Sequence, residues 1–237
     1  MSDRRAELAA SLADVRNRIG AACGDAGRDP ADVTLIAVTK TWPASDVAEL
    51  AALGVHDVAE NKDQEARAKA SSLESLDVRW HFVGQLQRNK ARSVVRYADV
   101  VHSVDRPELV TALAKAAAQH RDAPLDVLVQ VDLDSAAGRG GVAPAGVLAL
   151  AAEVAASDTL RLVGLMAVAP LGGDPDHAFA RLADVSRALR GEHADATWIS
   201  AGMSGDLESA VRHGATHVRV GSALLGKRVS GHGSVRP

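Results

Sequence analysis

The sequence is poor in cysteine and in aromatic residues, and it has no long apolar run. Its one cysteine, Cys23, cannot form an internal disulfide, which agrees with a reducing cytoplasm. Aromatic residues make up 3% of the chain although apolar residues make up 47%, so the core must consist mainly of alanine, valine and leucine. No stretch reaches the roughly 20 apolar residues of a membrane span. We therefore expect a cytoplasmic protein without a membrane partner.

An excess of positive charge and the common hydrolase motifs are absent as well. The formal net charge is -3, whereas a nucleic-acid partner usually needs a basic face. The sequence contains no His-Glu-x-x-His pattern, no Gly-x-Ser-x-Gly elbow and no P-loop. It therefore predicts no nucleic-acid partner and no metal site, and it gives little support to metal-dependent, serine-dependent or nucleotide hydrolysis.

The chain does contain a regular alternation of short β-branched runs and alanine-rich helical stretches. An extra N-terminal helix is expected from about Arg4 to Cys23, where apolar residues recur at helical spacing. Strands that alternate with helices predict a parallel sheet, and eight such units in 237 residues predict an α/β fold of the (β/α)8 TIM-barrel type. The expected strands are Val33–Val38, Val55–Ala59, Val78–Val83, Val100–His102, Asp126–Val131, Leu160–Met166, Thr197–Ser200 and His217–Val220. The expected helices between them are Ala44–Leu53, Lys62–Ser72, Asn89–Tyr97, Arg106–His120, Pro144–Ser157, Asp176–Arg190 and Ser204–His213.

No linker divides the chain into two domains. Residues 1–230 are therefore expected to form a single domain, and residues 231–237 are expected to form a disordered tail. The glycine-rich segment Asp134–Val142 is expected to be a flexible loop over the open end of the barrel.

Lys40 is the first candidate functional residue. It follows the strand expected over Val33–Val38 and comes just before Trp42, so it should lie at the end of the barrel where α/β barrels hold their chemistry. A partly desolvated lysine there can form a Schiff base with an aldehyde. On this segment alone, an exposed loop lysine is the simpler interpretation.

Two loops rich in glycine and serine are expected near the end of the chain. Ser200–Asp206 follows the seventh strand, and Gly221 and Ser222 follow the eighth. Backbone amides at a helix start bind anions, and the corresponding loops of α/β barrels frequently bind phosphate. The alternative for the first loop is a tight turn capped by Ser204 or Asp206.

Three polar residues at expected strand ends complete the candidates. Arg219 lies two residues before Gly221 on the same strand face, and it either pairs with an acid or faces a ligand. Asn61 follows the second strand and either contacts a ligand or caps the next helix. His81, in the third strand, is interpreted as a satisfied core histidine.

An amine nucleophile and a phosphate site at one barrel mouth fit a single ligand well. Pyridoxal 5′-phosphate (PLP) offers an aldehyde to Lys40 and a phosphate to the turn at Gly221 and Ser222. A Schiff-base aldolase of sugar phosphates would share the same elements and stays an alternative.

Separated segments between about residue 33 and residue 226 match, in order, the motifs of one known family. On these segments the chain resembles the PLP-binding homeostasis proteins, single-domain barrels related to the N-terminal domain of bacterial alanine racemase. The matching segments are Ala37–Lys40, Glu60-Asn61 with Gln64-Glu65, Trp80–Gly84, Leu86-Gln87 with Asn89-Lys90, His102–Asp105, Gly164–Met166, Gly202–Ser204 with Asp206–Glu208, and Gly214–Thr216 with Arg219–Ser222.

The resemblance implies roles for particular residues around bound PLP. Lys40 would carry the cofactor as a Schiff base with Asn61 beside it, and Arg219 would face the pyridine nitrogen. The loop after the seventh strand would surround the cofactor, and the turn after the eighth would bind its phosphate. The implied cofactor-binding set is Lys40, Asn61, Ser200, Met203, Ser204, Arg219, Gly221 and Ser222.

The chain departs from the family pattern at a few positions. Ala59 and Lys62 stand where the family often has a glycine and an aromatic residue, and Ala201 replaces a frequent methionine. The segment Gly138–Gly141 lacks the lysine that often precedes its glycine. These departures leave details of the pocket wall open, and they leave the expectation of PLP binding unchanged.

The expected arginine at the pyridine nitrogen bears on whether the protein is an enzyme. A cation there disfavours ring protonation and makes the ring a weak electron sink. Alanine racemases add a tyrosine base from a second domain, whereas the one tyrosine here, Tyr97, is expected in a helix. The resemblance thus favours a non-enzymatic protein of intracellular PLP (vitamin B6) homeostasis. It would serve PLP-dependent apoenzymes transiently, as a monomer or weak homodimer. The alternative is a PLP-dependent amino-acid racemase of low activity, with a lysine such as Lys62 as its base.

Overall fold

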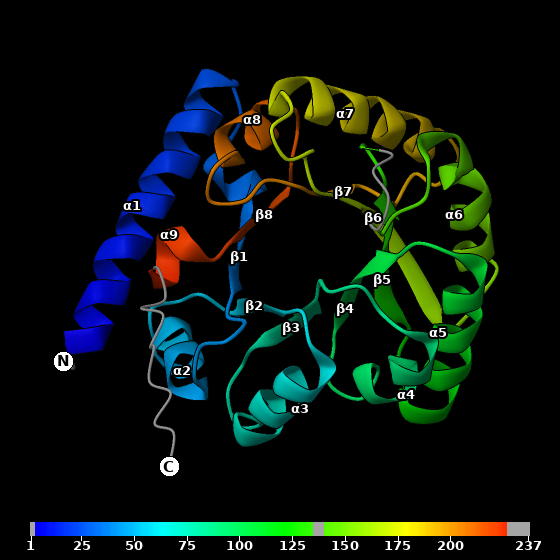
Figure 1. Ribbon diagram of the computed structural model, residues 1–237, viewed down its shortest axis with the longest axis horizontal. Helices are drawn as coiled ribbons and strands as arrows, with labels where there is room; N and C mark the ends of the chain where they lie inside the picture. Colours follow the sequence, from blue (N-terminus) through cyan, green and yellow to red (C-terminus); the bar gives the residue numbers. More distant parts are fainter. Residues whose placement is uncertain (1–2, 135–139, 227–237) are drawn as a thin grey trace, which may run out of the picture.

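The computed structural model describes residues 3–134 and 140–226, and its eight parallel strands form a closed barrel (Figure 1). Each strand pairs with the next one along the chain, and the last pairs with the first. The predicted (β/α)8 architecture is confirmed. The strands are β1 (Thr34–Val38), β2 (Asp57–Glu60), β3 (Arg79–Phe82), β4 (Val100–Val104), β5 (Leu125–Val131), β6 (Leu160–Ala167), β7 (Trp198–Ser200) and β8 (His217–Val220).

Helices surround the barrel on its outside (Figure 1). In the two described ranges, no helix combines the length and apolar character needed to cross a membrane. The helices are α1 (Asp3–Asp25), α2 (Ala44–Ala52), α3 (Asp63–Ser72), α4 (Ala91–Val94), α5 (Pro107–His120), α6 (Val147–Ala155), α7 (Pro175–Glu192), α8 (Leu207–Arg212) and α9 (Ser222–Leu225), with short 3-10 turns η1 (Pro30–Asp32), η2 (Arg88–Lys90) and η3 (Pro144–Gly146).

The N-terminal helix α1 is present and longer than predicted. Its apolar stripe is buried, and the helix packs against α8 and α9 beside the last strand (Figure 1). Arg18 ties it to α8 and to the loop after β7, because the guanidinium donates to Glu208 at 2.6 Å and to the carbonyl of Ser204 at 3.0 Å. The extra helix therefore supports the region where the second candidate loop lies.

Two helices differ from the sequence-based expectation. The helix predicted over Asn89–Tyr97 is only a 3-10 turn followed by the four residues of α4, because the amides of Arg96 and Tyr97 donate to carbonyls three residues back instead of four. The helix predicted from Ser204 begins at Leu207, because the Asp206 carboxylate accepts the Met203 amide at 2.6 Å and holds a turn.

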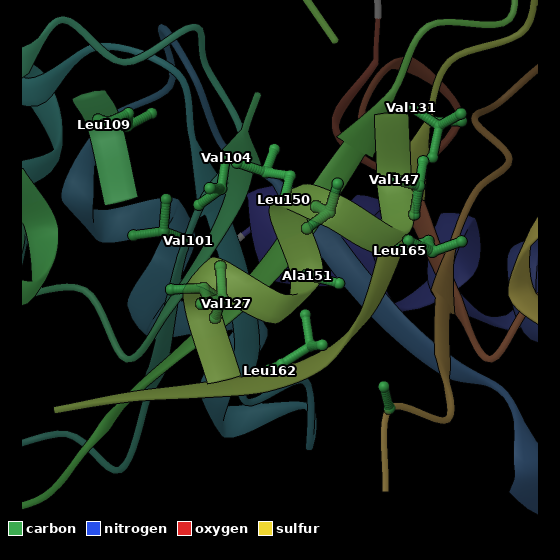
Figure 2. Close-up of a cluster of buried hydrophobic side chains, with 14 of the residues drawn as sticks. Val101, Val104, Leu109, Val127, Val131, Val147, Leu150, Ala151, Leu162 and Leu165 are labelled. Atoms are coloured by element: carbon green, nitrogen blue, oxygen red, sulfur yellow. The ribbon is translucent and has the colours of Figure 1, made fainter. Parts of the chain in front are cut away.

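The main apolar core lies between the barrel and its outer helices. Figure 2 shows the part formed by β4, β5, β6 and the helices α5 and α6, where every labelled side chain is a valine, leucine or alanine. This composition agrees with the low aromatic content. Inside the barrel several polar side chains are buried instead, among them His81, His102, Ser200 and Arg219.

Some predictions lie partly or wholly outside the described residues. They concern the glycine-rich loop at 135–139, including Gly138 and Arg139, and the domain end and tail beyond Gly226. At the described edge of that loop, Gln130 donates to the carbonyl of Gly140 at 2.6 Å.

Candidate functional site

Lys40 lies at the C-terminal end of β1, as the sequence predicted. It is exposed, and in the described part of the chain its amine makes no hydrogen bond or ion pair. Its side chain is exposed rather than partly desolvated, because Lys40 lies in a turn beyond the last paired residue of β1. The amine is free to reach a ligand at the barrel mouth.

The backbone around Lys40 is held firmly although its side chain is free. Thr41 has a φ of +69°, which is unusual for a β-branched residue. The Glu65 carboxylate accepts the Thr41 amide, and the Thr41 hydroxyl donates to the carbonyl of Lys40. On the other side, the amide of Thr39 donates to the carbonyl of Ala59 at 3.0 Å. The lysine therefore projects from a fixed turn.

A buried ion-pair cluster beneath this turn supports it. The Lys69 amine donates to the carbonyl of Thr39 at 2.8 Å, to Glu60 at 2.6 Å and to Glu65 at 2.8 Å. Glu60 also accepts the hydroxyl of Thr39 at 2.8 Å. Burial raises the pKa of Glu60, and the hydrogen bonds from Lys69 and Thr39 only partly oppose this. No motif in the sequence marked Lys69, which is 7% exposed.

Asn61 lies beside Lys40 at the end of β2. The register pairs Val38 with Ala59, so Lys40 and Asn61 each lie two residues beyond a paired position. The alternative in which Asn61 caps the next helix is wrong, because Lys62 occupies that position and no side chain caps the helix. The Asn61 Oδ1 atom is buried and has no hydrogen-bond partner among the residues that the structure describes. Such an atom is costly unless a ligand satisfies it.

Gly84 explains how the chain beside Asn61 packs so tightly. A Cβ atom at Gly84 would lie 2.1 Å from the carbonyl oxygen of Asn61. Only glycine therefore allows the segment after β3 to lie against the segment after β2.

Arg219 is buried inside the barrel and is 4% exposed. Its Nη1 atom donates to the carbonyl of Ser200 at 2.6 Å and to the Ser200 hydroxyl at 2.7 Å, and its Nη2 atom donates to the carbonyl of Ala167 at 2.8 Å. No carboxylate in residues 3–134 or 140–226 forms an ion pair with it, so the structural-bridge alternative is wrong there. Burial lowers the pKa of Arg219 to about 10, which still leaves it protonated at neutral pH.

The loops after β7 and β8 meet at the same end of the barrel. The amide of Ala223, in the first turn of α9, donates to the hydroxyl of Ser204 at 3.2 Å. Gly221 lies against β1, since a Cβ there would be 3.4 Å from the carbonyl of Val38. Ser222 is exposed, and Met203 is 38% exposed, which is unusual for a large apolar side chain. These residues therefore lie around one mouth, close to the turn that carries the lysine.

Ser200 and His81 are completely enclosed. Ser200 is 0% exposed, and its hydroxyl is already bonded to Arg219. His81 is 1% exposed and has a partner at each ring nitrogen, which agrees with its interpretation as a satisfied core histidine. His102, which contacts both residues, was quoted only as part of a motif and received no role from the sequence.

Chemically, the mouth combines a free amine, an unsatisfied buried amide oxygen, a buried guanidinium and a turn that opens a short helix. Within the described ranges, no group of three or more histidine, cysteine, aspartate or glutamate residues is arranged to hold a metal ion. The arrangement suits an organic ligand that has a carbonyl carbon, polar substituents and an anionic group.

Comparison with known proteins identifies a family and relatives that this chain resembles. Residues 12–229 match the family model described as alanine racemase, N-terminal domain. The Mycobacterium bovis protein named pyridoxal phosphate homeostasis protein is 47% identical over 244 residues, which cover 95% of each chain. The Escherichia coli protein of the same name is 37% identical over 234 residues, which cover 94% of this chain and 97% of that one.

Solved structures show the same likeness. The structure of PipY from Synechococcus elongatus with PLP bound has a TM-score of 0.81 and 34% identity, and the match covers 92% of this chain and 100% of that chain. Alanine racemase from Corynebacterium glutamicum has a TM-score of 0.69 at 14% identity, and the match covers 98% of this chain and 64% of the racemase. This second likeness is one of fold alone.

Proposed function

The chain belongs to the alanine racemase N-terminal domain family and, within it, to the pyridoxal phosphate homeostasis proteins, and from this premise we propose that it binds PLP through Lys40 and holds it for intracellular use. It takes up and releases the cofactor and does not turn over amino acids. The protein meets PLP-dependent apoenzymes only transiently, at the stage when the cofactor is transferred.

The residues at the barrel mouth fit PLP group by group. The free amine of Lys40 suits the aldehyde, and the unsatisfied Oδ1 of Asn61 suits the ring hydroxyl next to it. The guanidinium of Arg219 suits the ring nitrogen, which can accept a hydrogen bond from it. Gly221 and Ser222, at the start of α9, suit the phosphate. When bound, the cofactor supplies an aldehyde that forms a Schiff base with an amine, and the protein supplies position and charge.

The single observation that carries the binding proposal is the pairing of Lys40 with Asn61. A free amine lies beside a buried amide oxygen that has no partner, at the end of the barrel where α/β barrels bind ligands. A buried acceptor left unsatisfied costs free energy, so the site favours a ligand that has a hydroxyl group at that point.

Arg219 and Tyr97 support a binding role over catalysis. The buried guanidinium of Arg219 opposes protonation of the ring nitrogen, which strong carbanion chemistry requires. Tyr97 packs between the apolar clusters after α4, and burial raises its pKa further above the ordinary value. It is therefore neither placed nor tuned to act as a base at the mouth.

Visible absorbance and chemical trapping test the proposal. The protein mixed with PLP should become yellow, and borohydride should bleach it and leave a label that mass spectrometry finds on Lys40. Lys40→Ala should stay colourless, whereas Lys115→Ala, which removes an exposed lysine of α5, should behave like the wild type. A colourless wild-type protein, as expected of a sugar-phosphate aldolase, or a label on another lysine would overturn the proposal.

Racemisation assays test the alternative of a weak racemase. The holoprotein is expected to give no turnover of alanine or serine above that of free PLP. Robust racemisation that disappears in Lys40→Ala would show that the protein is an enzyme and would overturn the homeostasis proposal.

A further inference from the structure

Five polar side chains form one continuous hydrogen-bonded chain through the barrel interior, and we call them the interior chain. It begins with Asp57, the first residue of β2, whose Oδ1 atom lies 2.8 Å from Nε2 of His81 in β3. Nδ1 of His81 lies 2.8 Å from Nε2 of His102 in β4. Nδ1 of His102 lies 3.0 Å from the hydroxyl of Ser200 in β7, and this hydroxyl accepts Nη1 of Arg219 in β8 at 2.7 Å. The interior chain therefore connects five of the eight strands.

Only one placement of protons satisfies all four contacts when both imidazoles are neutral and Asp57 is ionised, as its lowered pKa favours. The Asp57 carboxylate can only accept, so His81 carries its proton on Nε2 and donates it to Asp57. Nδ1 of His81 must then accept, so His102 carries its proton on Nε2. Nδ1 of His102 must accept in turn, so the Ser200 hydroxyl donates to it and accepts from Arg219. Every hydrogen bond therefore points the same way, from Arg219 to Asp57.

The surroundings keep the interior chain neutral in its middle. Burial lowers the pKa of His81, and burial lowers the pKa of His102 well below its ordinary value. Burial also lowers the pKa of His217 to about 3, so this third imidazole adds no charge nearby. The charged groups that act on these histidines, besides the two ends of the interior chain, are Arg79 and Asp99.

Arg219 keeps two donors for a ligand. Of its five N–H groups, both on Nη1 go to Ser200, and one on Nη2 goes to the carbonyl of Ala167. The N–H of Nε and the second N–H of Nη2 have no partner in the part of the chain that the structure describes. The interior chain therefore determines which N–H groups of Arg219 remain available to a ligand.

We propose that the interior chain is a positioning device, in which Asp57, His81, His102 and Ser200 fix the orientation of Arg219 and thereby the rate of cofactor release. The inference rests on the proposed PLP site, and it gives Ser200 an indirect role. Its hydroxyl proton is committed to His102, so Ser200 acts on a bound cofactor through Arg219. Asp57 acts from the opposite end of the barrel.

Nuclear magnetic resonance of the full chain without PLP tests the proton order directly. Nitrogen-15 spectra of the histidine rings are expected to show His81 and His102 neutral at pH 7, each with its proton on Nε2. A proton on Nδ1 of either ring, or a charged ring at that pH, would overturn the inference. This measurement does not require that the protein bind PLP.

Ser200→Ala tests the link from the interior chain to the cofactor. It removes one hydrogen bond to a charged group, and release of PLP to an apoenzyme acceptor should become about tenfold faster while the yellow colour is kept. The ring signals of His81 should also shift, although His81 does not touch Ser200. Ser200→Thr keeps the hydroxyl and should restore both properties.

Ser186→Ala is the matched control, because Ser186 is a fully buried serine of α7 whose hydroxyl has no partner within the described ranges. Its PLP release and its histidine spectra should match those of the wild type. If Ser200→Ala releases PLP at the wild-type rate, or if the His81 signals do not move, the inference is overturned. A colourless wild-type protein would overturn the proposed function instead, and the proton order would still be decided by the spectra.

Discussion

The two sides of the barrel mouth hold their functional groups in opposite ways. On the β1 and β2 side, the Lys40 side chain is exposed and free, whereas the backbone beneath it is fixed by Glu65 and Lys69. On the β7 and β8 side, the Arg219 side chain itself is buried and fixed by three hydrogen bonds. The difference matches two tasks, since an amine that must form and break a bond needs freedom, and a group that recognises a ring needs a fixed direction.

The two sides also differ in how they balance charge. Beneath Lys40, the buried cation of Lys69 meets two carboxylates directly, those of Glu60 and Glu65. Around Arg219, the partners are carbonyl and hydroxyl oxygens, and the nearest link to a carboxylate runs through neutral imidazoles to Asp57. The first side therefore depends on ion pairs, and the second depends on neutral hydrogen bonds.

The largest effect on stability is expected when the ion-pair cluster on the β1 and β2 side loses the Lys69 amine. Lys69→Met leaves Glu60 and Glu65 without their partner in a buried cluster, so the free energy of unfolding should fall by about 3 kcal/mol. Urea unfolding measures this loss. Lys115→Met, on the exposed face of α5, should change stability by less than about 0.5 kcal/mol.

A double variant separates the charge from the packing of Lys69. In Lys69→Met with Glu60→Gln, no buried carboxylate remains at position 60, and we expect part of the stability to return. If Lys69→Met is as stable as Lys115→Met, the cluster is not the support of the Lys40 turn.

The next effect is a dependence of stability on pH, and it arises from the neutral histidines inside the barrel. The buried histidines bind a proton more weakly in the folded protein than in the unfolded chain, whose histidine pKa is about 6.5. Stability is therefore full above about pH 6.5 and falls as the pH is lowered, because the unfolded chain then takes up protons that the folded protein does not. For His217, whose pKa is lowered to about 3, the slope approaches about 1.4 kcal/mol per pH unit.

Urea unfolding at about pH 7 and about pH 5 measures this slope. His217→Gln removes one of the buried imidazoles and should make the dependence shallower. A stability that is equal at both pH values would show that the histidines do not stay neutral in the folded protein.

The contrast between the two sides also explains what the sequence could predict. Lys40 at a strand end and the turn at Gly221 follow from local patterns of apolar and small residues, and both were placed correctly. The position of Asn61 at the end of the neighbouring strand also followed from the local pattern, and the resemblance implied only its place beside the cofactor. Its unsatisfied oxygen depends on three-dimensional packing that no local pattern records.

Sequence patterns could not predict the interior chain, and the reason is geometric. The contact between His102 and Ser200 joins residues that are 98 positions apart and lie on strands that are not neighbours. It exists only once the barrel has closed with a defined register. The motif that contains His102 marked the residue, but nothing in the sequence indicated which partner it would meet.

Asn61→Leu is expected to separate stability from binding on the Lys40 side. The variant removes a buried acceptor that has no partner, so the ligand-free protein should become about 1 kcal/mol more stable in urea unfolding. The same change should weaken PLP binding, which a spectrophotometric titration measures. Asn89→Leu, at an exposed residue of η2, should change neither property. A loss of stability in the ligand-free Asn61→Leu protein would show that the amide oxygen is satisfied in solution.

The smallest effect is expected at the contact between the loops after β7 and β8. Ser204→Ala removes the acceptor for the amide of Ala223, so the free energy of unfolding should fall by about 0.5 kcal/mol. The start of α9 would be held less firmly, and PLP release should become a few-fold faster while borohydride still labels Lys40. Ser71→Ala, at an exposed serine of α3, should leave both unchanged. If Ser204→Ala instead abolished labelling of Lys40, the two sides of the mouth would be coupled, because a change on the fixed side would then control the reactivity of the free amine.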